Sequence, residues 1–214
     1  GVLVHGAVQI RNRVAVHGQQ VVGHERQVVF NYTGETIFTV RLHEPYASLH
    51  DLVIRNNGAA PYCMDVYHSY STGIMVGCQF GPSVNSGGAN GLIIVGPGYE
   101  ALGCRSYVID CVFKYHSSIH INVWNEYSSA ICNDGYYDKH YIYNCLIDGA
   151  DLAFRGKGVW EIKNTIARNV LGITYSFGTF NISSSLVTTG AGDVVFEADS
   201  VHTASNDTAA RDTG

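Results

Sequence analysis

The chain has 214 residues, of which 46% are hydrophobic and only 14% are charged, and its formal net charge at pH 7 is −5. This length fits one large domain or two small ones, and the high apolar content excludes intrinsic disorder for most of the chain. An acidic balance without any run of Lys or Arg argues against a nucleic-acid partner or an anionic lipid surface. The longest purely apolar run is residues 92–95, so we expect no membrane insertion.

Short runs of β-branched and aromatic residues recur from end to end, bounded by Gly, Asn, Asp and Ser. Helical periodicity is nearly absent, so the sequence predicts an all-β chain. The first runs, at residues 8–18, 27–30 and 36–40, predict one or two opening turns of stacked strands.

A short motif then repeats, in which a small residue stands among apolar ones. It is clearest in residues 107–113, 141–147, 161–167 and 181–187, and weaker in residues 48–53 and 74–80. Its small positions define six anchors, Asp51, Cys78, Cys111, Cys145, Thr165 and Ser185, which are 27, 33, 34, 20 and 20 residues apart. A shortest period of about 20 residues with variable insertions predicts a coiled parallel sheet, in which each turn contributes two or three strands.

A second strand is expected after each anchor. The six candidates are residues 64–67, 92–95, 119–123, 152–155, 172–175 and 194–197. Because the turns stack, insertions at the same point of successive turns are expected to lie together on one side of the stacked strands. The expected insertions are residues 68–72, 96–104 and 124–139, followed by a short one at residues 155–158.

The anchors and the entry segment at residues 12–18 resemble the right-handed parallel β-helix of the pectin-lyase-like superfamily, which includes polysaccharide lyases, glycosidases and bacteriophage tailspikes. The resemblance covers roughly residues 8–199. It implies an all-β, single-stranded right-handed parallel β-helix (solenoid) of about six to seven turns over residues 1–198, followed by a polar tail or linker at residues 199–214. The alternative is a β-sandwich or jelly roll, which the scarcity of hairpin signals disfavours.

The cysteines at the anchors predict a column of buried thiols on successive turns, since a buried free Cys behaves as a small hydrophobe. Disulfide bridges from Cys104 to Cys132 or to Cys63 are the alternative interpretation. No CxxC spacing occurs, so a zinc site is not expected.

The residue before three of the anchors is Asp110, Asn144 or Asn164. This placement resembles the polar ladders that turn corners in β-helices, where an Asn or Asp side chain satisfies a backbone group at the bend. We therefore predict that Asp110 is a corner residue rather than an acid catalyst.

The insertion at residues 124–139 combines aromatic rings with carboxylates. Such a surface suits a sugar chain, whose C–H faces pack on rings while its hydroxyls bond to acids and amides. The alternative is that these rings seal the loop onto the shaft or form an interface with a neighbouring chain. The predicted substrate-binding residues are Trp124, Tyr127, Tyr136, Tyr137, Tyr99, Glu100 and Arg155.

Hydrolysis of a glycoside requires two carboxyl groups on either side of the scissile bond. The candidate catalytic residues are Glu126, Asp134 and Asp138, with Glu100 as a possible partner from a neighbouring turn. A polysaccharide lyase is a weaker alternative, because no clustered Asp motif for Ca²⁺ is visible. The ten histidines are scattered, so we expect no metal site and no cofactor.

Taken with the resemblance, these features predict a polysaccharide-recognising protein of the phage tailspike type, which would be extracellular or on a virion surface. The resemblance implies a glycan depolymerase activity and a homotrimer, or contacts with other virion subunits. A non-catalytic structural or adhesive fibre module is the alternative from another functional class.

Overall fold

The molecule is built of β-strands, and no helix occurs among the residues described by this computed structural model. Those residues are 3–4, 8–10, 13–18, 28–42, 46–60, 63–69, 72–83, 89–95, 105–115, 129–133, 139–156, 158–175, 179–189 and 193–196. The predicted tail at residues 199–214 lies outside them.

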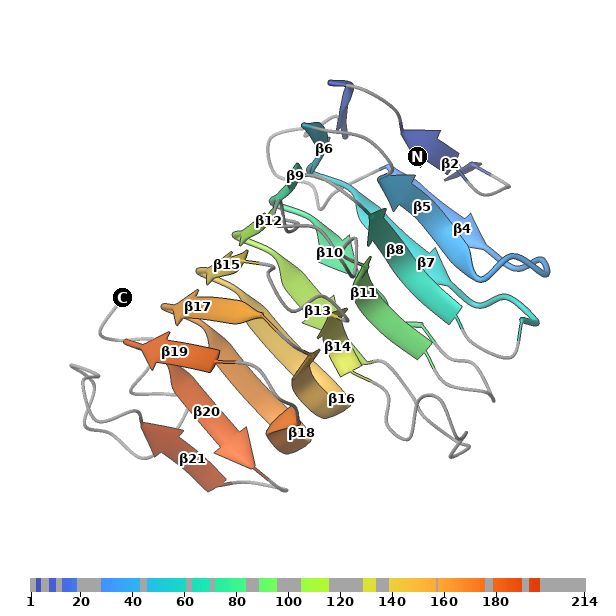
Figure 1. Cartoon of the computed structure of the whole chain (residues 1–214). Coiled ribbons are helices and arrows are strands. Elements are labelled where there is room, and N and C mark those ends of the chain that lie inside the picture. Colours follow the sequence, from blue (N-terminus) through green and yellow to red (C-terminus); the bar gives the residue numbers. More distant parts are fainter. Residues whose placement is uncertain are drawn as a thin grey trace, which may run out of the picture.

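The strands form two sheets (Figure 1). The larger sheet contains β1 (Leu3–Val4), β2 (Val8–Ile10), β4 (Val29–Tyr32), β5 (Phe38–Leu42), β7 (Val53–Asn56), β8 (Cys63–Ser69), β10 (Gln79–Phe80), β11 (Ala89–Val95), β13 (Val112–Lys114), β14 (Ser129–Asn133), β16 (Leu146–Gly156), β18 (Ile166–Tyr175), β20 (Leu186–Thr189) and β21 (Asp193–Phe196). The smaller sheet contains β3 (Ala15–His17), β6 (Ala47–His50), β9 (Thr72–Val76), β12 (Arg105–Ile109), β15 (Lys139–Tyr143), β17 (Val159–Lys163) and β19 (Thr179–Ser183).

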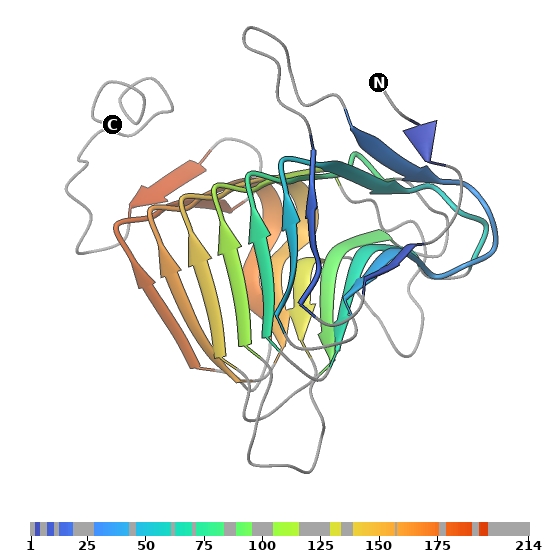
Figure 2. The same cartoon turned by 90° about the horizontal axis from the view of Figure 1, so that it is seen from above.

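Strands that lie side by side are three apart in chain order until β16 is reached. In the smaller sheet, for example, β9 pairs with β12 and β12 pairs with β15, all in parallel (Figure 2). β16 is one long strand in the place of two, because its first part pairs with β13 and its last part with β14, and β18, which is almost as long, pairs along it. The prediction of an all-β chain with stacked parallel strands is confirmed.

One predicted strand has the wrong direction. Residues 194–197 were expected to continue the parallel stack, but β21 pairs antiparallel with β20. A parallel neighbour needs a crossover of a dozen or more residues, whereas only residues 190–192 separate these two strands. The short connection therefore forces an antiparallel pairing.

Four of the predicted second strands are confirmed, at residues 64–67, 92–95, 152–155 and 172–175. The one expected at residues 119–123 lies outside the described residues. Instead, β14 occurs inside the segment predicted to be a loop, and it pairs with β11 and β16. Ile131 is its one β-branched residue, so local composition does not mark it as a strand and its pairing partners decide its structure. The insertion predicted at residues 68–72 is also wrong at both ends, since β8 runs to Ser69 and β9 begins at Thr72.

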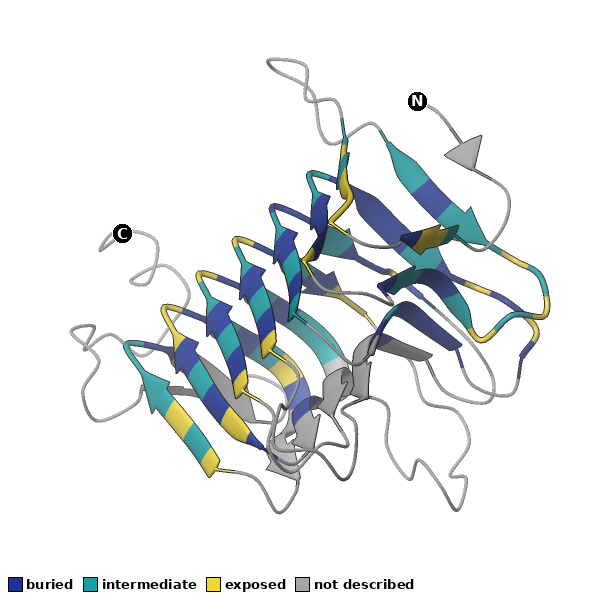
Figure 3. Ribbon diagram, turned by 45° about the horizontal axis from the view of Figure 1, so that its top comes forward, coloured by how far each residue is buried: buried dark blue, intermediate teal, exposed yellow. Residues whose placement is uncertain are grey.

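The core lies between the sheets, and burial alternates along β9, β12, β15 and β17 of the smaller sheet (Figure 3). Inward side chains form files from one strand to the next. One file in the smaller sheet consists of Leu49, Met75, Val108, Ile142 and Ile162, all of them buried. In the larger sheet, the rings of Phe80 and Phe113 stack with centroids 4.4 Å apart. Residues at equivalent positions of neighbouring strands thus pack on one another in the core.

Five of the six predicted anchors lie in one buried file, namely Cys78, Cys111, Cys145, Thr165 and Ser185. The sixth, Asp51, is wrong by one position. The register of β7 with β10 places Val53 beside Gln79, so Leu52 lies beside Cys78. Leu52 is fully buried, whereas Asp51 is at the corner before it. A large apolar side chain fills this end of the file, so the position does not match the motif of small residues that defines the other anchors.

The anchor side chains bond to the backbone. The hydroxyl of Thr165 donates to the carbonyl of Lys163 (3.0 Å) and accepts a bond from the backbone N–H of Cys145 (3.4 Å). The Cys145 thiol makes the corresponding contact with the carbonyl of Tyr143 (3.2 Å). Ser185 repeats the pattern with the carbonyl of Ser183 (2.8 Å). Each of these three anchors therefore bonds to the carbonyl two residues before it.

The described cysteines are thiols, as the favoured interpretation predicted. Cys63, Cys78, Cys111 and Cys145 are buried and form no disulfide. This result excludes a bridge to Cys63, while the side chains of Cys104 and Cys132 lie outside the described part of the structure. Burial, and then the neighbouring thiols of Cys145 and Cys78, raises the pKa of Cys111 well above its usual value. These thiols are packing groups and are not poised as nucleophiles.

The residues before the anchors turn the corner. Asp110, Asn144 and Asn164 all have positive φ angles, of 53°, 55° and 49°. Their side chains are exposed, while the backbone N–H of Asp110 donates to the carbonyl of Tyr143 in the next strand (3.0 Å). The prediction that Asp110 is a corner residue is confirmed. Asn and Asp suit this file because they tolerate the left-handed conformation better than other side chains do.

Candidate functional site

The residues predicted to bind and cleave a sugar lie almost entirely outside the described part of the chain. They are Trp124, Glu126, Tyr127, Asp134, Tyr136, Tyr137, Asp138, Tyr99 and Glu100. Arg155 is the exception, since it belongs to β16 and is in register with Cys132 of β14 and Tyr175 of β18. Its side chain is not described, so its role stays a prediction.

The outer face of the smaller sheet presents a second group of aromatic and charged residues. Along β12 and β15 the buried residues alternate with exposed or half-buried ones, so the latter point away from the core. We define the tyrosine face as the outward side chains of β12, β15 and β17 that carry an aromatic ring or a charge. It consists of Arg105, Tyr107, Lys139, Tyr141, Tyr143, Glu161 and Lys163.

The rings of this face are held in a fixed order. Tyr107 and Tyr141 are in register, and their rings stack with centroids 4.8 Å apart and planes within 8°. Tyr143 meets the ring of Tyr141 edge-on at 6.2 Å. Because adjacent parallel strands are about 4.8 Å apart, the sheet itself sets the ring spacing. All three tyrosines are half-buried, so part of each side chain is exposed on this face.

A small ionic network borders the rings. Lys163 forms an ion pair with Glu161 two residues before it, and its ammonium lies 5.8 Å from the ring centroid of Tyr143. Bonding to Lys163, and also to the Tyr143 hydroxyl, lowers the pKa of Glu161. Partial burial, and then contact with Glu161, raises the pKa of Tyr143. At neutral pH this border carries an ionised carboxylate, an ammonium and a neutral phenol.

The sequence contains a signal for this face, although the predicted site did not include it. Tyr107 and Tyr141 stand at the same distance before the anchors Cys111 and Cys145, in the very segments that define the repeat. Equivalent positions of successive repeats lie side by side in a parallel stack, so the repeat predicts that these two tyrosines are neighbours. Their outward direction does not follow from counting back to the anchors, because the corner residues Asp110 and Asn144 lie in between and interrupt the alternation of sides. The predicted site comes from the long insertions and does not include either tyrosine.

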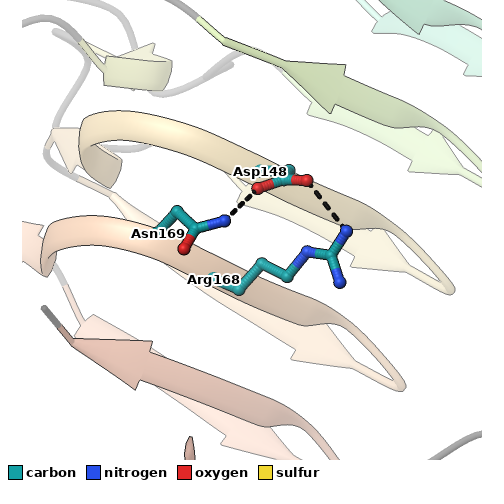
Figure 4. A network of polar contacts seen from close by, with 3 residues as sticks. All are labelled: Asp148, Arg168 and Asn169. Atoms are coloured by element: carbon teal, nitrogen blue, oxygen red, sulfur yellow. Dashed lines mark hydrogen bonds and ion pairs between the residues drawn. The ribbon is translucent and has the colours of Figure 1, made fainter. Parts of the chain in front are cut away.

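A second polar group joins β16 to β18 in the larger sheet (Figure 4). One carboxylate oxygen of Asp148 accepts a bond from Arg168 (2.9 Å), and the other accepts one from the side-chain amide of Asn169 (2.7 Å). Asn169 has a positive φ of 54°, and so does Gly149 of the neighbouring strand, at 78°. Both oxygens of Asp148 are therefore used to fasten a second corner, which makes it a structural residue.

Two histidines lie in the core. His68 and His140 are fully buried, and Nδ1 of His68 lies 3.1 Å from the hydroxyl of Ser106. The imidazole of His68 occupies the space above Gly73, where a Cβ would come within 2.8 Å of the ring. Burial lowers the pKa of His68 to about 4 and that of His140 to about 3. Neither ring reaches the surface, so this pair belongs to the core.

Another buried polar cluster surrounds Asp65. Its carboxylate accepts bonds from the Ser83 hydroxyl and from the backbone N–H of Asn56 (2.7 Å). The side-chain amide of Asn56 donates in turn to the carbonyl of Met64 (3.1 Å). The side chains of Asp65, Ser83 and Asn56 are completely buried. This cluster satisfies the backbone where β7 leads into β8 and offers no access to a substrate.

Among the described residues, no group of three or more His, Cys, Asp or Glu side chains is placed to hold a metal ion. Within that same part of the chain, no helix has the length and apolar composition of a membrane span. No protein family, curated protein or solved structure matches the chain.

Proposed function

We propose that the chain is a right-handed parallel β-helix of the pectin-lyase-like type and that it binds a polysaccharide on the tyrosine face. The strand order supports the fold, because up to β16 each strand pairs in parallel with the strand three places earlier in the chain. Such winding is the arrangement that a coil of about six or seven turns requires.

The ordered row of tyrosines carries the proposal for polysaccharide binding. Tyr107, Tyr141 and Tyr143 are half-buried, so packing fixes the order of their rings while part of each side chain stays exposed. Phenol hydroxyls both donate and accept hydrogen bonds, as sugar hydroxyls do. A polymer that lies along the file meets the same group on successive strands, which suits a ligand made of repeating units.

The insertion predicted from the sequence to bind sugar leads into this face. Residues 124–139 end at Lys139, which is the first residue of β15 and an outward residue of the tyrosine face. We propose that Trp124 and the tyrosines of that insertion extend the same binding surface. Glycoside hydrolysis by Glu126, Asp134 and Asp138 stays part of the proposal, as do a virion or extracellular location and a homotrimer.

The test removes hydroxyls without removing rings. A variant with Tyr107→Phe, Tyr141→Phe and Tyr143→Phe keeps the stacking and the buried area. Tyr115→Phe is the matched control, because Tyr115 is 55% exposed and directly follows β13 in the larger sheet. Affinity electrophoresis against a panel of neutral and acidic polysaccharides measures binding. We expect the triple variant to lose binding and the control to keep it. Equal binding by both variants would contradict the proposal.

A structural or adhesive module is the second candidate, and one observation favours it. The tyrosine face continues toward β9 in apolar outward side chains that are only half-buried, namely Ile74, Val76 and Ile109. Apolar groups beside tyrosines are typical of contacts between subunits. Light scattering of Ile74→Lys and Ile109→Lys separates the two functions, because a charge placed in an interface between subunits would dissociate the oligomer, whereas a surface that only binds polysaccharide would leave the oligomeric state unchanged.

A further inference from the structure

We infer that Arg105 and Lys139 form an anion-binding subsite on the tyrosine face, so that the polysaccharide recognised there is an anionic one that carries carboxylate or sulfate groups. This inference rests on the proposed function and names its ligand class. The two cations begin the neighbouring strands β12 and β15 and are directly in register.

The register brings two like charges together. Adjacent parallel strands are about 4.8 Å apart, and like charges directly opposite each other destabilise a sheet. Both side chains are exposed, and no described residue forms an ion pair with either of them. An anionic group bound between them would offset this repulsion through charge-assisted hydrogen bonds to both cations.

The neighbours of the pair supply no competing negative charge on these strands. The residues in register on either side are Thr72 and Val159, of which Val159 is 41% exposed. The carboxylate of Glu161 is already paired with Lys163. Asp110 follows the opposite end of β12 from Arg105.

The charge of the tyrosine face is opposite to that of the whole chain. The outward residues of β12, β15 and β17 include three cations, Arg105, Lys139 and Lys163, against the single carboxylate of Glu161. The chain as a whole has a net charge of −5. A positive surface on an acidic protein steers anionic ligands to that one face and disfavours non-specific contact elsewhere.

Tyr107 and Tyr141 follow the cations by two residues on the same strands and point the same way. The subsite therefore presents two charges beside two stacked phenols. An acidic sugar unit matches this order, because its charged group and its hydroxyls lie at different positions of one ring. Arg binds a planar carboxylate through two N–H groups, and Lys acts as a point charge.

The experiment uses the full chain and four immobilised polymers: alginate, carboxyl-reduced alginate, dextran sulfate and dextran. The variant is Arg105→Gln with Lys139→Gln, and the control is Lys114→Gln, an exposed cation of β13 in the larger sheet. We expect the wild type and the control to bind alginate or dextran sulfate more tightly than the uncharged counterpart. The double variant should lose about tenfold or more in that affinity, and the salt dependence of binding should weaken.

The two charged polymers distinguish a carboxylate from a sulfate ligand. Unchanged binding of both by the double variant would overturn the subsite. Binding of dextran or reduced alginate alone, abolished by the Tyr→Phe triple variant, would overturn the subsite while supporting the proposed function. Binding of none of the four would count against both. The melting temperature of the double variant should equal or exceed that of the wild type, since removing in-register like charges relieves repulsion.

Discussion

The two faces of strands β12, β15 and β17 differ in the side chains that the pairing of these strands brings into register. On the inner face, Val108, Ile142 and Ile162 form one apolar file, and Ser106, His140 and Trp160 form a second file of mixed polarity. On the outer face, the same pairings align tyrosines and charges. The difference shows that one backbone register specifies both the core and the surface array. Mutations on the two faces should therefore separate stability from binding.

The largest expected effect comes from protonating the two buried histidines, His140 on the inner face and His68 of β8, which contacts Ser106 of that face. Because the pKa values of folded His68 and His140 are about 4 and about 3, the unfolded chain takes up protons below about pH 6.5 while the folded chain does not. Stability is therefore complete above about pH 6.5 and is lost as the pH falls toward these values. At about 1.4 kcal/mol per pKa unit, the loss between pH 7 and pH 4 amounts to several kcal/mol.

Chemical denaturation at a series of pH values measures this effect. His140→Leu should weaken the pH dependence of the free energy of unfolding, because it removes one of the two buried imidazoles. An identical slope in the wild type and His140→Leu would show that the buried ring does not control acid stability.

The next largest effect is expected from Trp160→Ala. Trp160 is fully buried, stacks on Phe180 at 5.3 Å and contacts the rings of Phe154 (6.0 Å) and His140 (4.5 Å). Removing such a side chain costs about 3–5 kcal/mol, because the cavity cannot close fully. Urea denaturation checks the value, and a loss below about 1 kcal/mol would contradict this packing.

A smaller effect is expected at the anchor file. Thr165→Val keeps the shape of the side chain but removes the hydroxyl that bonds Lys163 and Cys145, so about 2 kcal/mol of stability should be lost. Thr165→Ser retains the hydroxyl and serves as the matched control. If Val and Ser were equally tolerated, the anchor would act only through its size.

The smallest effect on stability is expected on the outer face. Tyr107→Ala removes one stacked ring and should cost about 1 kcal/mol or less, while Tyr107→Phe should leave the free energy of unfolding unchanged. Thermal denaturation of both variants measures this. A large loss in Tyr107→Phe would show that the hydroxyl belongs to the fold and is not free to bind a ligand.

The two faces also differ in how far the sequence predicts them. Small inward residues at regular spacing identified the parallel stack, because an inward position at a corner accepts only certain side chains. The same criterion missed Leu52, whose size hides the repeat, and placed Asp51 in the file instead. The outer face was missed because exposed positions have no such steric requirement. The pairing of β14 depends on partners far away in the chain, which local composition does not encode.

Thr165 and Ser185 are separated by 20 residues and occupy equivalent positions, with no long insertion between them. The segment between them is thus a unit of length for this protein. Duplicating or deleting 20 residues there would add or remove one layer and leave every later side chain on its proper side. Inserting or deleting 19 residues instead would shift the register of the following strands by one residue. Their outward side chains would then point into the core.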